Sequence, residues 1–298
     1  MTLSVIIVSF NTKKLLTDLL VSLKKAILVC ENHAIKVATI IVDNNSSDGT
    51  VEFIKKHFSW VQIIANHKNL GYSKANNQAI KKTKSDYVLL LNSDMILYPD
   101  TLYKSLKFII DKPQAGAMTC RVELASGKID PASHRGFPTP WNGFCYFSGL
   151  EKLFPKSKLF SGYHQGWKDL TKSHEIDACS GAFFLIKKKA IEKIGLLDED
   201  FFMYGEDLDW AYRLKNSGFK IYYFPKAKII HFKKRSGREK INDDPHSQQS
   251  LNLIKKKTSQ SFFETMKLFY QKHYLNKYPP FVSKLTFWGI DTVSKFKH

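Results

Sequence analysis

The sequence lacks several features that would each have assigned it to a familiar class. Its four cysteines, Cys30, Cys120, Cys145 and Cys179, are widely scattered, with no C-x-x-C pair and no histidine spacing suited to zinc. No apolar run approaches the roughly 20 residues that span a bilayer. There is no G-x-G-x-x-G or Walker element, no internal repeat and no low-complexity tract. We therefore expect reduced, buried thiols, and a nucleotidyltransferase with a glycine-rich phosphate loop is disfavoured.

The N-terminus also lacks the features of a signal peptide. Residues Met1–Phe10 have no basic region and no small-residue cleavage site, so they are predicted to form a buried strand. The expected location is the cytoplasm, with the inner face of the cell membrane as the specific alternative.

Acidic residues are scarce relative to basic ones. The chain has 46 Lys and Arg against 27 Asp and Glu, a formal net charge of +19. Such a charge indicates a polyanionic partner, which could be nucleic acid, anionic lipid or a nucleotide-activated substrate. No recognised nucleic-acid-binding module is present, so we expect no nucleic-acid partner.

The first 120 residues alternate between strand-like and helix-like segments. This alternation predicts a parallel, doubly wound α/β sheet. The predicted strands are Ser4–Phe10, Val37–Val42, Val61–Ile64 and Tyr87–Leu91, and the intervening helices carry Leu15–Leu23, Val51–His57 and Lys74–Lys82.

Polar residues follow three of these strands at the point where each strand ends. They are Ser9–Asn11, Asp43–Asn45 and Asn92–Asp94. In open α/β sheets ligands bind beyond the carboxyl ends of the strands, so these clusters predict a nucleotide-sized site. Asp43 suits a ribose or base contact or an ordinary turn, and Asp94 suits a divalent cation or a helix N-cap.

The pattern loosens from residue 121 to about residue 174, which we interpret as an acceptor-side loop. Regular structure returns at Ile176–Ile186 and the helical Lys189–Gly195, and a last strand, Lys220–Phe224, is predicted to end before Pro225. The region from about residue 250 is basic and aromatic. It suits either an interfacial membrane helix or a helix packed on its own domain.

A dense acidic segment runs from Asp198 to Arg213. Its acids lie among aromatic residues, where desolvating them is costly unless they are used or neutralised. An ordinary amphipathic helix with an Asp209–Arg213 ion pair fits the same spacing. Separately, His231 follows a strand-like run and could complete a metal shell with Asp94, while Lys233, Lys234 and Arg235 could meet phosphate oxygens.

Taken together, these motifs resemble family 2 glycosyltransferases, in particular their rhamnosyltransferase-like branch. The resemblance covers about Leu3 to Phe232. Its motifs, in the order seen in the family, are Ser4–Asn11, Val42–Thr50, Asn69–Asn77, Leu89–Asp94, Ser180–Ala182 and Tyr204–Arg213.

The resemblance implies a GT-A fold, with a Rossmann-like, mostly parallel sheet flanked by helices and a C-terminal helical extension. It implies inverting transfer of a sugar from a nucleotide diphosphate sugar, dTDP-rhamnose or a UDP-sugar, to an acceptor hydroxyl. The acceptor would be a saccharide on a lipid-linked bacterial surface polysaccharide such as O-antigen or capsule, and peripheral membrane association would follow.

Residue roles are likewise implied by the matched motifs. Asp207 would be the general base, with Glu206 beside it, and nearby apolar rings and a second acid would raise the pKa of this carboxylate toward working pH, which suits that role. Asp94 and His231 would hold Mg²⁺ or Mn²⁺, although Asn92 replaces the first acid of the family's D-x-D element. The implied donor contacts are Ser9, Asn11, Asp43, Asn45, Asn69, Gly71, Lys74, Asn76, Asn92 and Ser93, and the acceptor or diphosphate candidates are Ser180, Gly181, Arg213, Lys233 and Arg235.

The predicted organisation is a catalytic domain over residues 1–240 and a basic, aromatic extension over 241–298. The catalytic domain divides into a donor-binding half, 1–120, and an acceptor-side half, 121–240. A non-catalytic scaffold of the same fold or a polyanion-binding protein is the alternative. The sequence leaves open the sugar, the nucleotide, the acceptor, the linkage and the oligomeric state.

Overall fold

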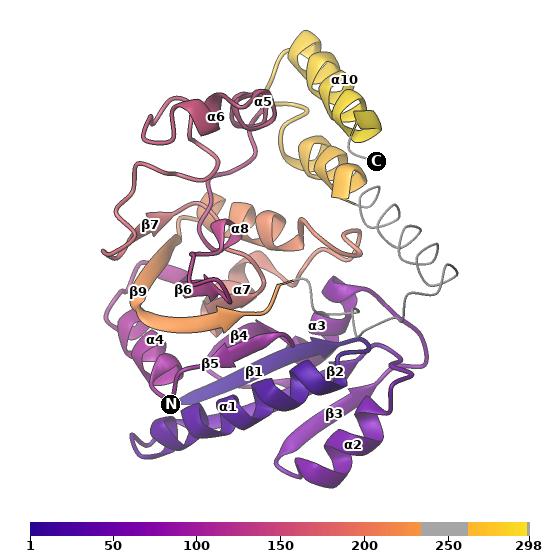
Figure 1. Cartoon of the computed structure of the whole chain (residues 1–298), viewed down its shortest axis with the longest axis vertical. Coiled ribbons are helices and arrows are strands. Elements are labelled where there is room, and N and C mark those ends of the chain that lie inside the picture. The colour runs from indigo at the N-terminus through magenta and orange to yellow at the C-terminus, as the bar shows by residue number, and fades with distance from the viewer. Residues whose placement is uncertain (234–261, 297–298) are drawn as a thin grey trace.

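A nine-stranded sheet runs through the computed structural model, which describes residues 1–233 and 262–296. Its strand order is β3-β2-β1-β4-β8-β6-β9-β5, and β7 pairs with β9 (Figure 1). The strands are β1 (Thr2–Ser9), β2 (Lys36–Asp43), β3 (Val61–Ala65), β4 (Tyr87–Asn92), β5 (Met95–Leu97), β6 (Ala115–Leu124), β7 (His174–Ile176), β8 (Phe183–Lys187) and β9 (Lys220–His231).

Helices cover both faces of the sheet. One core cluster joins the sheet to α1 and α4, and a second joins it to α3, α7 and α8. The helical elements are α1 (Lys13–Glu31), α2 (Thr50–His57), α3 (Tyr72–Lys82), α4 (Thr101–Ile110), the 3-10 turn η1 (Pro131–Ser133), α5 (Pro140–Ser148), α6 (Leu150–Leu153), α7 (Lys188–Ile194), α8 (Glu206–Asn216), residues 262–273, and α10 (Pro280–Phe296). The predicted α/β class with flanking helices is confirmed.

The first half of the sheet is parallel, as predicted. β1 lies between β2 and β4, and β2 pairs with β3. Strands covered on both faces are apolar throughout, which explains why β1 and β4 read as continuous hydrophobic runs. The register places Ser9 beside Asp43 and Val8 beside Asn92, so the predicted polar clusters meet at one edge.

The second half of the sheet is mixed. β8 runs antiparallel to β4 and β6, whereas β6 and β9 are parallel. The prediction that the last strand ends before Pro225 is wrong, because β9 continues to His231. Its pairing with β6 moves from Phe224 to Lys228, so Pro225 lies in an irregularity where its missing N–H breaks no ladder hydrogen bond.

The segment read as one irregular loop contains short helices. α5 starts after Thr139, whose hydroxyl accepts a hydrogen bond from the Asn142 N–H, with Pro140 at the first helical position. All four cysteines are buried free thiols, as expected.

The C-terminal region packs against the domain through aromatic residues. Phe269, Tyr270 and Tyr274 are buried in a cluster with Phe201 and Tyr212, the latter from α8. Within residues 1–233 and 262–296, no helix is long and apolar enough to cross a membrane.

Candidate active site

The Asp207 carboxylate is the centre of the site. It lies in the first turn of α8, after Gly205, whose φ of 80° starts the helix in a left-handed conformation. Its Oδ2 accepts hydrogen bonds from Arg135 Nη2 at 2.8 Å and from the Gly181 N–H at 3.2 Å. Although burial opposes its charged form, the Asp207 carboxylate raises the pKa of Arg135 above its usual value. The carboxylate is therefore oriented by an ion pair and by the loop before β8.

The neighbouring Glu206 has a different environment. Its side chain is buried, and among the described residues its Oε2 has no hydrogen-bond partner. Burial and the adjacent Asp207 carboxylate raise the pKa of Glu206 to about 8. Glu206 is therefore mostly protonated at neutral pH.

Tyr72, at the start of α3, bridges two parts of the site. Its hydroxyl donates to the Gly181 carbonyl at 3.1 Å and lies 3.3 Å from Asn92 Oδ1. Burial, followed by Glu206 and Asp207, raises the pKa of Tyr72 above its usual value. The phenol thus stays a neutral donor that connects the acidic end of α8 with the end of β4.

Asp94 and His231 lie together, as predicted. Both side chains are buried, and His231 Nε2 is 3.4 Å from Asp94 Oδ1. Asp130 Oδ2 is 2.8 Å from His231 Nδ1, and Asp130 Oδ1 is 3.0 Å from Lys233 Nζ. Against the effect of burial, Asp130 and Asp94 raise the pKa of His231 to about 9, while His231 and Lys233 lower the pKa of Asp130.

This donor set suits a divalent cation. A carboxylate on one ring nitrogen orients the histidine, which is the usual support of a metal-bound histidine, and the other nitrogen would become a ligand when a cation displaces its proton. An imidazole beside a carboxylate favours Mn²⁺ over Mg²⁺. Residues 1–233 and 262–296 contain no group of three or more metal-binding side chains, so diphosphate oxygens and water would have to complete the shell.

The loops after β1 and β2 are tied together. Asp43 is buried and accepts from the Ser46 N–H and hydroxyl, which is the turn alternative left open by the sequence. Asn11 donates its N–H to Ser46 Oγ at 2.8 Å and accepts the Ser47 N–H at 2.8 Å. Ser9 is fully buried beside Thr12, and Asn45 is exposed with a φ of 70°. Of these predicted donor contacts, Asn45 is the one whose side chain lies open at the rim.

The loop before α3 is fixed by its glycine. Asn69 Oδ1 accepts the Gly71 N–H at 2.9 Å, and Gly71 has a φ of 82°. A Cβ at Gly71 would lie 2.5 Å from the Phe202 carbonyl oxygen, so no other residue fits. Lys74 is exposed, whereas Asn76 is fully buried and donates to the Tyr72 carbonyl.

The remaining candidates divide between the site and the scaffold. Gly181 contacts Asp207, Ser180 beside it is half-buried, and Ser93 is buried next to Asp94. Arg213 instead binds Asp209 and the carbonyls of Ile194 and Leu196, which is the ion-pair alternative stated above. Lys233 binds Asp130, and Arg235 lies outside the described residues.

Sequence reasoning missed Arg135, Asp130 and the role of Tyr72. Arg135 and Asp130 lie in the stretch read as an irregular loop, and their partners are 72 and 101 positions away. A single chain gives no signal for such pairs. Tyr72 lies within a matched motif, and the available clue was its position directly after Gly71, at the start of a helix.

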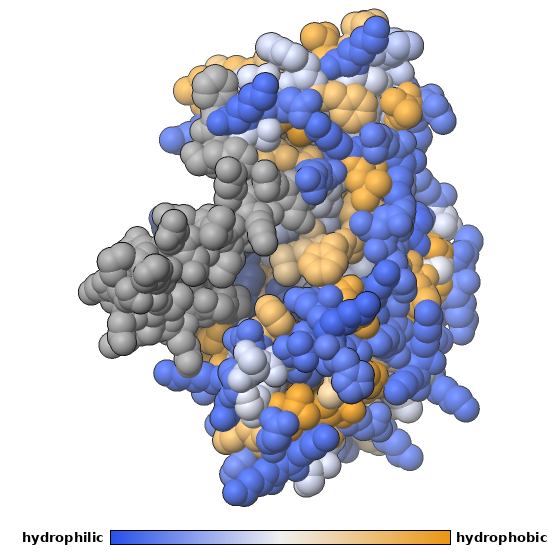
Figure 2. Space-filling view, turned by 90° about the vertical axis from the view of Figure 1, so that its right-hand side faces the viewer, coloured by the Kyte–Doolittle hydropathy of each residue, from blue (hydrophilic) through white to orange (hydrophobic). Residues whose placement is uncertain are grey.

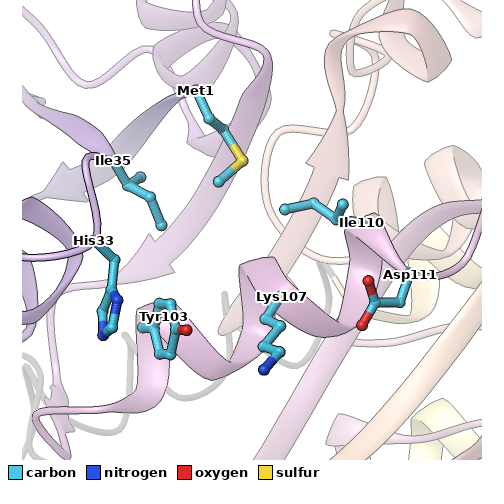
Figure 3. Close-up of a pocket in the computed structure, with 7 residues that line it drawn as sticks. All are labelled: Met1, His33, Ile35, Tyr103, Lys107, Ile110 and Asp111. Carbon is cyan, nitrogen blue, oxygen red and sulfur yellow. The ribbon is translucent and has the colours of Figure 1, made fainter.

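A separate hollow of about 260 Å³ lies away from this site (Figure 3). Met1, His33, Ile35 and three residues of α4 line it, together with Asp111. It opens at the amino end of β1 and β2, the edge opposite the one where ligands bind in such sheets. It contains none of the predicted site residues.

Known proteins of one family are similar to this chain. The family model for glycosyl transferase family 2 matches residues 4–195. The N-acetylglucosaminyl-diphospho-decaprenol L-rhamnosyltransferase of Mycobacterium tuberculosis is 27% identical over 215 residues, covering 68% of this chain and 69% of that protein.

Solved structures share the fold at low sequence identity. TarS from S. aureus matches with a TM-score of 0.57 and 16% identity, over 96% of this chain and 69% of that one. The mannosyltransferase PcManGT from Pyrobaculum calidifontis, in complex with GDP-Man and Mn²⁺, matches with a TM-score of 0.54 and 15% identity, over 99% and 75%. The chain has a GT-A fold. It is a glycosyltransferase that belongs to glycosyl transferase family 2 and is similar to its rhamnosyltransferase-like branch.

Proposed function

We propose that the protein is an inverting transferase that moves a sugar from a nucleotide diphosphate sugar to a hydroxyl of a lipid-linked saccharide. The observation that carries this proposal is the pairing of two sites at one sheet edge. Asp207 lies beside Gly181, and Tyr72 connects Gly181 with Asn92, two residues before Asp94. These contacts support a proton acceptor and a diphosphate site on adjoining segments.

Asp207 is the proposed general base. The acceptor oxygen forms its bond to the anomeric carbon, the bond from that carbon to the diphosphate oxygen breaks, and the acceptor proton passes to Asp207. Glu206 is unsuited to this role at neutral pH because its raised pKa keeps it protonated. Arg135 and the Gly181 N–H hold the Asp207 carboxylate in one orientation, which lowers the entropic cost of reaching a reactive geometry.

Asp94 and His231 are the proposed holders of Mn²⁺ or Mg²⁺. When bound, the cation would neutralise charge that develops on the departing diphosphate. Asp130 keeps the His231 ring oriented, and Lys233 lies beside it with its side chain half exposed toward solvent. The PcManGT complex with GDP-Man and Mn²⁺ supports use of a divalent cation with a nucleotide sugar.

The proposed donors are dTDP-rhamnose and UDP-sugars, and the proposed acceptor is an intermediate of a bacterial surface polysaccharide such as O-antigen or capsule. The named M. tuberculosis rhamnosyltransferase supports a lipid-linked acceptor. Such a reaction would take place at the inner face of the cell membrane, where nucleotide sugars and lipid-linked acceptors meet.

The direct test is a turnover assay on the full chain. Each sugar nucleotide is incubated with Mn²⁺ and an N-acetylglucosaminyl diphosphoprenol, and NMR follows the anomeric proton. We expect a glycoside of opposite anomeric configuration to the donor. Donor binding without any transfer or hydrolysis would favour the non-catalytic scaffold, and retention of configuration would remove the single-displacement mechanism.

A further inference from the structure

α10 carries apolar side chains on two opposite faces. The inner face places Ile290 in a buried position and Phe287 against the aromatic cluster of Tyr270 and Tyr274. The outer face exposes Phe281, Leu285 and Trp288, at 64%, 61% and 68%. These three lie at i, i+4 and i+7, which is one stripe of a helix. Packing on the domain explains the inner face and leaves the outer one unexplained.

A second group of exposed apolar side chains comes from the segment of α5, α6 and the loop that follows. Trp141 and Phe144 share one face of α5, and Leu153 at the end of α6 is 72% exposed. Phe154 and Leu159 follow at 50% and 60%. Five large apolar side chains within about 20 residues exceed the scattered exposure of an ordinary surface.

The two groups are neighbours. α5, α6 and α10 lie at the same end of the molecule, and Figure 2 shows apolar side chains there among hydrophilic ones (Figure 1, Figure 2). A groove of about 580 Å³ separates them, lined by Tyr146 and Phe147 of α5, Lys152 of α6 and Val293 of α10. The exposed groups and the groove between them form one surface, which we call the apical surface.

The exposed charges of the apical surface are mainly positive. Lys152, Lys156, Lys158 and Lys284 are exposed. Over 140–160 and 274–296 the acids are Glu151, which is buried, and Asp291, which is ion-paired with Lys267. Tryptophan, phenylalanine and leucine interleaved with lysine is the composition of a surface that lies in the interface of an anionic bilayer.

We propose that the apical surface docks the protein on an anionic lipid bilayer through two separate elements, α10 and the α5–α6 segment. A single stripe of three side chains gives weak binding, and two stripes with shared lysines provide the second signal that stable anchoring needs. This inference does not depend on the sugar that is transferred.

The position of the apical surface relative to the catalytic carboxylate adds a consequence that rests on the proposed function. The centroids of the Tyr146 and Tyr163 rings are 5.6 Å apart. The Tyr163 hydroxyl lies 3.4 Å from Arg135 Nη1, and Arg135 donates a hydrogen bond to Asp207. Docking would therefore bring the acceptor side of the site close to the lipid surface.

The test is co-flotation of the full chain with vesicles of phosphatidylcholine alone and of phosphatidylcholine mixed with phosphatidylglycerol. Two double variants each replace two exposed apolar side chains of one element by glutamate. They are Leu285→Glu/Trp288→Glu in α10 and Phe144→Glu/Leu153→Glu in the α5–α6 segment. The matched control is Val21→Glu/Leu28→Glu, because these α1 residues are 49% and 48% exposed and lie far from the apical surface. Thermal melting of every variant verifies folding.

We expect the wild type and the α1 control to float with the vesicles that contain phosphatidylglycerol. Each apical variant should bind these vesicles at least about tenfold more weakly. Equal flotation of the apical variants and the control would overturn the assignment of the surface. Absence of wild-type flotation, or a dimer in sedimentation that only the apical variants abolish, would overturn the bilayer as the occupant. Unchanged donor-induced stabilisation in the apical variants separates this result from a failure of the proposed function.

Discussion

The two halves of the sheet organise their polar residues in different ways. In the parallel half, Asp43 binds Ser46 and Asn69 binds Gly71, so the loops after β2 and β3 contain local hydrogen bonds, and Asn11 ties the loop after β1 to the loop after β2. In the mixed half, Asp207 binds Arg135 and His231 binds Asp130, across 72 and 101 positions. The first half therefore offers a preformed rim of backbone and amide groups, and the second half assembles the charged pairs to which we assign the proposed chemistry.

The largest effect should follow from a change of Asp207, the proposed general base in the mixed half. Asp207→Asn keeps the shape and the Gly181 contact but removes the proton acceptor, so turnover should fall by about 10²–10⁴-fold. Donor binding should stay near the wild-type value, because the rim of the parallel half is untouched. Steady-state kinetics and calorimetric donor titration measure the two effects, and near-normal turnover would remove Asp207 from the mechanism.

The next effect concerns Asp130, which contacts His231, the proposed metal ligand, without being a proposed ligand itself. Asp130→Asn leaves a weaker partner for His231 Nδ1, and Mn²⁺ affinity in the presence of nucleotide diphosphate should fall by about 10–100-fold. Isothermal titration with Mn²⁺ measures this change. Asp48→Asn, in an exposed turn of the parallel half, is the control and should leave the affinity unchanged.

Two arginines distinguish chemistry from scaffold. Arg213→Ala removes the partner of the buried Asp209 carboxylate and should lower the free energy of unfolding by about 1–3 kcal/mol. His273, 2.8 Å from Asp209, limits this loss. Arg135→Gln should instead lower turnover. Chemical denaturation and kinetics on both variants decide the matter, and a turnover defect in Arg213→Ala larger than in Arg135→Gln would reverse these assignments.

The last expected effect is a pH dependence of stability from Glu206, which leaves the proposed chemistry aside. Its pKa is about 8 in the folded protein and about 4.3 in an unfolded chain, so between these values the folded state binds more protons. Stability from this group should therefore decline as pH rises through that range, with a slope of up to about 1.4 kcal/mol per pH unit.

The Glu206→Gln variant lacks this titration, so a comparison of its unfolding free energy with that of the wild type across pH tests the prediction. The difference in unfolding free energy between variant and wild type should grow from pH 5 to pH 8 and then level off. Parallel curves at all pH values would show that Glu206 is ionised in the folded protein.

The contrast between the halves also explains what the sequence could reveal. The strands of the parallel half were predictable because apolar runs such as Tyr87–Leu91 end in polar loops, and α/β topology brings those ends together. The continuation of β9 through Pro225 was missed, because a strand proline is tolerated only where the partner strand leaves its N–H unneeded. Arg135 and Asp130 were missed because no local sequence pattern indicates partners that lie 72 and 101 positions away.

The C-terminal region shows the same limit. Composition left membrane binding and domain packing as alternatives for its aromatic residues. Phe269 and Tyr270 pack on the domain, whereas Phe281 and Trp288 face outward, where we propose membrane binding. Periodicity identifies the stripes of a helix, but only the fold shows which stripe is covered.

The most direct test of the central claim is a thermal-shift measurement with UDP, dTDP, GDP and their sugars, with and without Mn²⁺, on the wild type, Asp94→Asn and Asp207→Asn. A ligand that binds only the folded state raises the melting temperature. The account predicts a Mn²⁺-dependent rise with one nucleotide in the wild type and in Asp207→Asn, and loss of the Mn²⁺ dependence in Asp94→Asn. No rise with any nucleotide in folded protein, or an unchanged Mn²⁺-dependent rise in Asp94→Asn, would contradict it.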